Sequence, residues 1–317
     1  MTKNLITGGL GFIGYHLTNL LLEKGEEVTI FDLAPGSNLF RNMMDKVTLI
    51  RGDIGNWSHV LDAVRTSEAD CIYHMGAMLP PGSEQNPQGA FNVNVNGTYN
   101  VLEAARMFGV ESTMFISTLA TYGRDVPSVV PNDAAQHPVN MYGVTKVCCE
   151  RLGEYYHRRF GLNFRAVRLT PILGMGRVDS AQSAYLYKSV QESAMGRPYS
   201  IYVNPDTSIA VLYVKDAAWG LYDLKNASEE SLTTRVYNLY GLTVNGQELF
   251  DAIKKVVPDA GVDFKPDEKQ IQLVGNLPAR LDDTMARTDW KWAPRFTLVD
   301  AVADFVKDVR ENSDIYG

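Results

Sequence analysis

The stretch Thr7–Gly14 reads T-G-G-L-G-F-I-G and separates a short apolar run from a segment with helical apolar periodicity. This order predicts a strand, a tight turn and a helix. The glycines fit two spacings, G-x-G-x-x-G from Gly9 and G-x-x-G-x-x-G from Gly8. Under either spacing, residues without a side chain let the backbone turn sharply and approach a pyrophosphate. The helix N-terminus then presents unpaired N–H groups to the phosphates.

An acidic residue follows the glycines at the spacing found in dinucleotide-binding folds, which argues against a plain glycine-rich turn. Residues 27–32 read E-V-T-I-F-D, a second predicted strand that ends in Asp32, about 20 residues further on, as in such folds. Its carboxylate can accept hydrogen bonds from both hydroxyls of an adenosine ribose and would repel a 2′-phosphate. No arginine follows until Arg41. We therefore interpret Asp32 as a ribose ligand rather than an ordinary turn carboxylate, and expect NAD rather than NADP.

The composition is that of a globular protein. The chain has 317 residues, of which 45% are hydrophobic and 21% charged, enough for one large domain or two interleaved ones. The net charge of −7 comes without a basic stripe, so neither nucleic acid nor an anionic membrane is an expected partner. No signal segment and no membrane-spanning apolar run is apparent, which favours a cytoplasmic protein. The cysteines and histidines show neither disulfide nor metal-site spacing, so no metal is expected.

Further apolar runs predict more strands of the same sheet. They are Val47–Arg51, Asp70–His74, Thr113–Ser117 and Arg165–Leu169. Ligands in open α/β sheets lie beyond the carboxyl ends of the strands. We expect the small residues at Met75–Ala77 to let the cofactor pass, and the hydroxyls of Ser117 and Thr118 to face the same crevice.

Several polar residues near these strand ends have two interpretations. Asp53 can accept the adenine amino group or cap the helix expected over Trp57–Val64. His74 is expected to be a core residue, because no acid or nucleophile is spaced to work with it. The Asn92–Asn96 run falls in a helix expected over residues 90–108, where asparagine lowers helix propensity. Such a conflict is expected at functional positions, although solvated asparagines would also explain it.

A second constellation lies at the start of a helix predicted to run from Asn140 to about Phe160. Tyr142 and Lys146 are four residues apart and share one helix face. An ammonium group beside a phenol favours the phenolate and lowers its pKa from about 10. Tyr142 would then be a usable general base near neutral pH. An exposed Tyr/Lys pair is the alternative, which the glycine turn, Asp32 and the Ser117-Thr118 strand end make less attractive.

Together these stretches resemble the extended short-chain dehydrogenases/reductases, the NAD-dependent epimerase/dehydratase superfamily. The resemblance spans nearly the whole chain in family order: Thr7–Gly14, Asp32, Gly52-Asp53, His74–Ala77, Asn94–Thr98, Ser117–Gly123, Tyr142–Lys146, Arg168–Gly174 and Tyr213–Ala217. It implies an α/β fold with a Rossmann-type doubly wound parallel sheet and a smaller, interleaved C-terminal substrate-binding lobe. The expected division is residues 1–171 with about 206–240 for the NAD-binding domain, 172–205 and 241–296 for the lobe, and 297–317 for a closing helix.

The resemblance also assigns roles to residues. Thr118, Tyr142 and Lys146 match the catalytic Ser/Thr and the Y-x-x-x-K pair, and Asn94 matches an asparagine that supports the cofactor and the central helix. The family's usual homodimer pairs the helices around 90–108 and 141–160 in a four-helix bundle. The full set of expected cofactor-binding residues is Gly8, Gly11, Phe12, Ile13, Gly14, Asp32, Asp53, Ile54, Met75, Gly76, Ala77, Asn94, Ser117, Tyr142, Lys146 and Thr170.

Departures from the family pattern narrow the range of expected substrates. Nucleotide-sugar members usually carry an arginine where this chain has Ser208–Ala210, and an Arg-Pro step where it has Gly275–Pro278. Those arginines grip a diphosphate, to which guanidinium groups are well suited. Their absence argues against a nucleotide-diphosphate sugar. The tail Pro278–Trp292 resembles instead the end of short-chain-type L-threonine dehydrogenases, and some short sugar-acid dehydrogenases share this layout.

The expected reaction is the oxidation of a small polar hydroxy compound. Tyr142 takes the hydroxyl proton, a hydride passes to C4 of NAD⁺, and Thr118 holds the substrate oxygen at near-attack distance. The residues expected to meet substrate are Met78, Thr118, Arg177, Lys188 and Arg280. An epimerase or dehydratase with tightly held NAD is the main alternative. A non-catalytic NAD-binding regulator is a further one, against which the intact Tyr/Lys pair argues.

Overall fold

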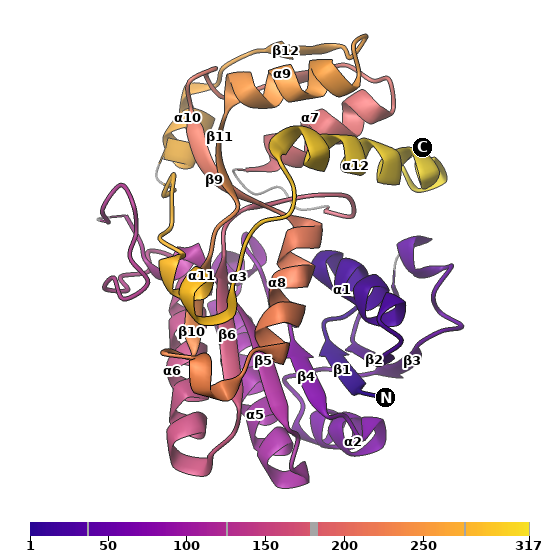
Figure 1. The fold of residues 1–317 in the computed structure, drawn as a ribbon, viewed down its shortest axis with the longest axis vertical. Coiled ribbons are helices and arrows are strands. Elements are labelled where there is room, and N and C mark those ends of the chain that lie inside the picture. The colour runs from indigo at the N-terminus through magenta and orange to yellow at the C-terminus, as the bar shows by residue number, and fades with distance from the viewer. Residues whose placement is uncertain (37, 125, 178–182, 276, 317) are drawn as a thin grey trace.

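The computed structural model describes residues 1–36, 38–124, 126–177, 183–275 and 277–316. A parallel sheet lies at its centre (Figure 1), with the strand order β10-β6-β5-β4-β1-β2-β3. Its strands are β1 (Lys3–Thr7), β2 (Glu27–Asp32), β3 (Thr48–Arg51), β4 (Cys71–His74), β5 (Ser112–Thr118), β6 (Phe164–Leu169) and β10 (Val236–Leu239). The order reverses between β1 and β4, and a ligand crevice is expected at such a switch point. The predicted doubly wound α/β fold is confirmed.

Helices cover both faces of the sheet, and each face has its own hydrophobic core. Adjacent residues of a strand point to opposite faces: Leu5 packs in the core under α2, α5 and α6, whereas Ile6 packs in the core under α1 and α8. This double burial explains why the strands read as continuous apolar runs. The helices involved are α1 (Phe12–Glu23), α2 (Trp57–Ser67), α5 (Gly97–Phe108), α6 (Met141–Phe160) and α8 (Val214–Asn226).

A second group of elements lies beyond the carboxyl ends of the strands (Figure 1), where α12 packs against α7 and α9. The apolar face of α12 includes Val302, Phe305 and Val309, all buried. This part contains β7 (Ile172–Leu173), α7 (Ala184–Ala194), β8 (Tyr199–Ile201), β9 (Ser208–Tyr213), β11 (Leu242–Asn245), α9 (Gly246–Val256), β12 (Val262–Phe264), α10 (Glu268–Gly275) and α12 (Leu298–Glu311). Helix α11 (Thr284–Trp290) lies instead beside β10 at the edge of the central sheet (Figure 1). The sequence also predicts a helix from about Ala181 to Met195, which corresponds to α7. Residues 181 and 182 lie outside the described part of the chain.

The helix expected over residues 90–108 is interrupted. The structure divides it into α4 (Pro87–Ala90), a π-helical turn over Phe91–Asn96 and α5. Asn92 and Asn96 are exposed, as solvated asparagines would be, whereas Asn94 is buried. A functional role of this run stays a prediction. The wider turn is consistent with the poor helix propensity of this run, and π-turns are frequent at functional sites.

Helix α6 lies unusually close to the sheet at Gly153. A Cβ atom at this position would lie 2.2 Å from the ring of Phe164 on β6, and that ring is fully buried. Any side chain at residue 153 must therefore displace the ring or lift the helix.

We predict that Gly153→Ala destabilises the protein. Alanine favours the helix by about 1 kcal/mol, but overpacking a core costs about 1–3 kcal/mol. We therefore expect a net loss of up to about 2 kcal/mol in the free energy of unfolding. Urea denaturation would measure it. Gly275→Ala is the matched control, because no atom lies within 4 Å of a Cβ there. Equal stability of the two variants would contradict the close contact.

Candidate active site

The glycine turn is built by distinct constraints at three positions. Gly8 has φ +68°, and a Cβ atom there would lie 2.6 Å from the Cα of Gly76 beyond β4. Gly11 is the N-cap of α1 and supplies no capping side chain. A Cβ atom at Gly14 would lie 2.3 Å from the carbonyl oxygen of Gly9. The G-x-x-G-x-x-G spacing therefore fits the structure: Gly8 forms the turn, Gly11 leaves the N-terminus of α1 open, and Gly14 allows close packing. A side chain at Gly9 would be crowded as well.

Asp32 is held against this turn by both of its oxygens. Oδ2 accepts a hydrogen bond from the Leu10 N–H (2.9 Å) and Oδ1 from the Ala34 N–H (2.8 Å). A carboxylate has about four lone-pair positions, so acceptor capacity remains for ribose hydroxyls. Arg51 is distant from Asp32 in sequence, so the sequence did not indicate it. In the structure it lies opposite Asp32, where β3 pairs with β2. Its guanidinium donates to the carbonyls of Ala34 and Pro35.

The capping alternative for Asp53 is wrong. The N-cap of α2 is Asn56, whose side chain accepts from the N–H groups of Ser58 and His59. Asp53 instead accepts from the Gly55 N–H at 2.8 Å. Its contact with adenine stays a prediction.

The predicted cofactor residues around the β4 end pack closely. Ile54 is buried, and its side chain lies 2.9 Å from where a Cβ atom at Gly76 would be, and 3.0 Å from one at Gly97. Met75 and Ala77 flank Gly76 and are half-buried, as are Phe12 and Ile13 at the start of α1.

His74 is a core residue, as expected. One ring nitrogen is 2.6 Å from the Thr7 hydroxyl and the other is 2.9 Å from the Thr98 hydroxyl. Burial, with a further contribution from the charge of Lys146, lowers the pKa of His74 to about 3. The ring is therefore neutral near pH 7 and links β1, β4 and α5.

Asn94 connects the loop after β4 to helix α6. Its Oδ1 accepts from the Met78 N–H (2.7 Å), and its Nδ2 donates to the Met78 carbonyl (3.1 Å) and to the Thr145 hydroxyl (2.9 Å). The π-helical turn carries this buried side chain. Asn94 therefore fixes the backbone of a predicted substrate residue to the helix of Tyr142 and Lys146.

The three predicted catalytic residues come from two elements that touch directly. Thr118 ends β5, and its Oγ1 accepts from the Ala120 N–H. Helix α6 begins beside this turn, because a Cβ atom at Gly143 would lie only 2.4 Å from the Ala120 carbonyl oxygen. Tyr142 is thereby brought next to the turn of Thr118, with Lys146 one helical turn further on.

Burial dominates the electrostatics of the pair. Lys146 is buried, donates from Nζ to the Ile116 carbonyl (2.6 Å) and lies 4.4 Å from the Phe115 ring centroid. Burial lowers the pKa of Lys146 to about 8. It also raises the pKa of Tyr142, contrary to the expected lowering, because Nζ is directed to a carbonyl and lies 5.7 Å from the tyrosine ring centroid.

Two other predicted cofactor residues differ in their surroundings. The Ser117 hydroxyl donates to the buried carboxylate of Glu150, so it does not face the crevice as we expected. The Thr170 hydroxyl is buried without a hydrogen-bond partner among the described residues. A buried unpaired hydroxyl is costly, which is consistent with a ligand that bonds to it.

The expected substrate residues fall into different environments. Arg177 is buried and donates to the Ile172 carbonyl (2.9 Å) and to the Ser183 hydroxyl (3.1 Å), so it stabilises its own lobe rather than presenting a free guanidinium. Lys188 is half-buried on α7. Arg280 is exposed and lines a cavity of about 440 Å³.

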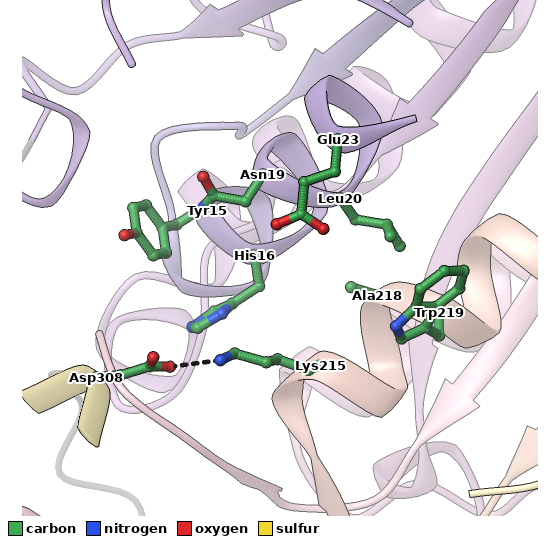
Figure 2. Close-up of a pocket in the computed structure, with 9 residues that line it drawn as sticks. All are labelled: Tyr15, His16, Asn19, Leu20, Glu23, Lys215, Ala218, Trp219 and Asp308. Carbon is green, nitrogen blue, oxygen red and sulfur yellow. Dashed lines mark ion pairs between the residues drawn. The ribbon is translucent and has the colours of Figure 1, made fainter. Parts of the chain in front are cut away.

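A further cavity of about 380 Å³ lies between α1, α8 and α12 (Figure 2). Across it, Lys215 forms an ion pair with Asp308 at 2.9 Å. The predicted site residues do not line this cavity. It is therefore separate from the crevice at the strand ends, although it adjoins the outer face of the helix that follows the glycine turn.

Comparison with known proteins identifies the family. The model of the NAD dependent epimerase/dehydratase family matches residues 4–239. The chain belongs to this family. It is 29% identical over 304 residues to bovine mitochondrial L-threonine 3-dehydrogenase, covering 94% of this chain and 80% of that one.

Solved structures agree with this assignment. The holo form of a GalE-like L-threonine dehydrogenase from Cupriavidus necator has a TM-score of 0.89 at 26% identity, covering 97% of this chain and 99% of that one. A monomeric L-threonine 3-dehydrogenase from a metagenome has a TM-score of 0.87 at 26% identity, covering 98% and 99%. Like these relatives, this epimerase/dehydratase family member is an NAD-dependent oxidoreductase.

The residues present fit NAD. The close approach of Gly8 to Gly76 leaves backbone where side chains would obstruct a pyrophosphate, and the α1 N-terminus is open beside it. The Thr170 hydroxyl, which follows the carboxyl end of β6 and has no hydrogen-bond partner among the described residues, offers a further polar contact.

We predict that Asp32→Ser weakens NAD binding about 10- to 100-fold, the effect of losing a hydrogen bond to a charged group. The variant should also admit NADP, because Arg51 lies in register beside residue 32 and can meet a 2′-phosphate. Titrations of both cofactors would measure this. The double variant Asp32→Ser/Arg51→Gln should lose the gain in NADP binding. An unchanged NAD/NADP preference in Asp32→Ser would rule out the ribose contact.

Proposed function

We propose that this NAD-dependent oxidoreductase oxidises a small hydroxy substrate of the hydroxy-amino-acid or sugar-acid type, with Thr118, Tyr142 and Lys146 as its catalytic residues. The observation that carries the proposal is the direct contact of Gly143 with the Ala120 carbonyl. This contact joins the helix of the Tyr/Lys pair to the strand end of Thr118. The L-threonine dehydrogenase relatives support the amino-acid branch of the substrate class.

In this mechanism the chain's own residues hold the substrate oxygen and move its proton. The Thr118 hydroxyl donates to that oxygen and orients the reacting carbon. The phenolate of Tyr142 accepts the hydroxyl proton, and the Lys146 ammonium stabilises the phenolate. NAD, when bound, supplies the hydride acceptor. Because burial raises the pKa of Tyr142, the positive charge of Lys146 is needed to make the phenolate accessible.

The surroundings of the site favour a small substrate over a nucleotide sugar. Ser208 begins β9 and Leu277 packs near the hydrophobic cluster that includes Leu119, at places where nucleotide-sugar relatives would need arginines. Arg280 is the better candidate to bind a substrate carboxylate, because Arg177 is bonded within its lobe. Lys188 stays a weaker candidate on α7.

A second function is an epimerase or dehydratase reaction, which the family as a whole supports. In such a reaction the cofactor is regenerated in every turnover, and no NADH accumulates. The regulator alternative has less support, because the Tyr/Lys pair is intact and Lys146 is buried against β5.

We also propose a homodimer through α5 and α6. Both helices expose large apolar side chains, among them Tyr99, Met107, Tyr155 and Phe160. The monomeric relative shows that this fold does not require a partner. No described helix is long and apolar enough to span a membrane. A cytoplasmic location stays an expectation, since the bovine relative is mitochondrial.

Tyr142→Phe should lower NADH production about 10²- to 10⁴-fold, the contribution typical of a general base, while NAD affinity changes little. The measurement is nicotinamide absorbance with L-threonine, small sugar acids, aldoses and nucleotide sugars, followed by chromatography of the products. Tyr155→Phe, on the outer side of the same helix, is the matched control. Full turnover by Tyr142→Phe would exclude this mechanism, and isomerised or dehydrated product without NADH would favour the second function.

For the dimer, Met107→Glu and Tyr155→Glu should each shift the protein toward monomers in sedimentation velocity. A charge on an apolar interface must be desolvated without a partner. Leu33→Glu is the control, because residue 33 is 71% exposed and lies outside both helices. A wild-type protein that sediments as a monomer at all concentrations would refute the proposed assembly.

A further inference from the structure

The proposed mechanism does not use Glu150, a carboxylate inside α6. Its side chain is fully buried. It accepts hydrogen bonds from Nε (2.9 Å) and Nη2 (2.7 Å) of Arg168, from Nε2 of Gln136 (2.8 Å), from Nη2 of the half-exposed Arg151 (3.3 Å) and from the Ser117 hydroxyl. A two-pronged arginine–carboxylate pair of this kind is strong and fixed in orientation. The carboxylate therefore holds α6 to β5 and β6 in one geometry.

Arg168, on β6, extends these contacts to the far side of the Thr118 turn. Its side chain is 4% exposed, and Nη1 donates to the Tyr122 hydroxyl (2.6 Å) and to the Asn132 carbonyl (2.7 Å). The Glu150–Arg168 pair thus bonds to Ser117, immediately before Thr118, and to Tyr122, at the end of the turn that Thr118 begins.

Glu150 also lies on the catalytic side of its helix. Tyr142, Lys146 and Glu150 follow one another at intervals of four residues, so all three lie along one stripe of α6. One carboxylate therefore connects the helix stripe that carries the Tyr/Lys pair to the strand end that carries Thr118.

We propose that Glu150 and Arg168 form a positioning pair, which fixes α6 against the Thr118 turn so that Tyr142 and Lys146 meet Thr118 in reactive geometry. Neither residue touches substrate or NAD in this proposal. It rests on the proposed function, since it assigns the pair to that set of catalytic residues.

The negative charge of Glu150 also stabilises the ammonium form of Lys146. Although burial raises the pKa of Glu150, the hydrogen bonds and charge of Arg168 hold it below the usual value, so Glu150 is an anion at neutral pH. The other titratable groups that face Lys146 are neutral there. Burial raises the pKa of Cys149 to about 11 and, with the charge of Lys146, lowers that of His74 to about 3.

Tyr142 is the remaining titratable neighbour of Lys146, and burial raises its pKa too. From β5, Lys146 faces the Ile116 carbonyl and the Phe115 ring, neither of which is titratable. Removing the negative charge of Glu150 leaves the ammonium less stabilised and lowers the pKa of Lys146 from about 8. The ammonium is then lost at a lower pH.

The test uses Glu150→Gln, the double variant Glu150→Gln/Arg168→Met and the control Glu154→Gln. Glu154 lies one turn further along α6, and Arg151 pairs with both carboxylates, at 2.8 Å with Glu154 and at 3.3 Å with Glu150. The control therefore removes a neighbouring carboxylate of the same helix while Glu150 and Arg168 stay in place. Neutral replacement of both partners keeps a buried site foldable, so the double variant serves where Glu150→Gln does not fold. We expect the kcat of the double variant to fall about 100-fold, the effect of displacing a reacting group by about 1 Å, with little change in KM. Glu154→Gln should match the wild type.

A pH profile separates positioning from a merely structural role. In Glu150→Gln the alkaline limb of kcat/KM should move to lower pH, because Lys146 loses its proton sooner. Lower melting temperatures together with wild-type kcat and an unmoved alkaline limb would overturn the proposal.

The pH dependence of NADH binding needs no turnover and keeps the two proposals distinguishable. Lys146 is a predicted cofactor ligand, so NADH affinity should weaken above a pH near 8 in the wild type and at lower pH in Glu150→Gln. A wild-type protein without turnover would refute the proposed function alone. Identical NADH-binding profiles of the two proteins would refute the positioning pair alone.

Discussion

The structure depends on the direct packing of α6 against the sheet, with no side chain between them at two glycines. Gly143 meets the Ala120 carbonyl and Gly153 meets the Phe164 ring. These contacts bring the backbone of α6 close to the turn that follows β5 and to β6, which is the arrangement that the proposed pairing of Thr118 with Tyr142 requires. A bulkier residue at either glycine would separate the two elements on which the proposed chemistry depends.

The same packing determines the electrostatics of the site. Burial opposes the charged form of both partners: it raises the pKa of Tyr142 and lowers that of Lys146 to about 8. The two shifts work against a phenolate–ammonium pair, whereas the mutual attraction of the charges favours it. A cationic cofactor ring beside the phenol would add to that attraction. The site is therefore arranged so that its reactive ionisation state depends on what else occupies the crevice.

Local patterns predicted much of the fold and part of the site. The glycine turn, Asp32 and the Tyr142/Lys146 spacing are encoded within one turn or one helix, where residue spacing fixes geometry. What the patterns missed depends on neighbours distant in sequence. Arg51 lies beside Asp32 only because β3 pairs with β2, and the Ser117 hydroxyl turns to Glu150 rather than to the crevice.

The residues expected to meet substrate show the same limit of prediction from sequence, because their type does not reveal how each is bonded in the fold. Arg177 was among the residues expected to meet substrate, but its guanidinium bonds to Ile172 and Ser183. Arg280 keeps its exposed head group at a cavity. The type of a charged residue shows which interactions it can form. Whether it can bind a ligand depends on whether its hydrogen-bonding groups are already used by backbone carbonyls and other side chains. The expected cofactor contacts involve mostly backbone and glycine, and for this reason they are easier to predict from sequence than contacts with a substrate.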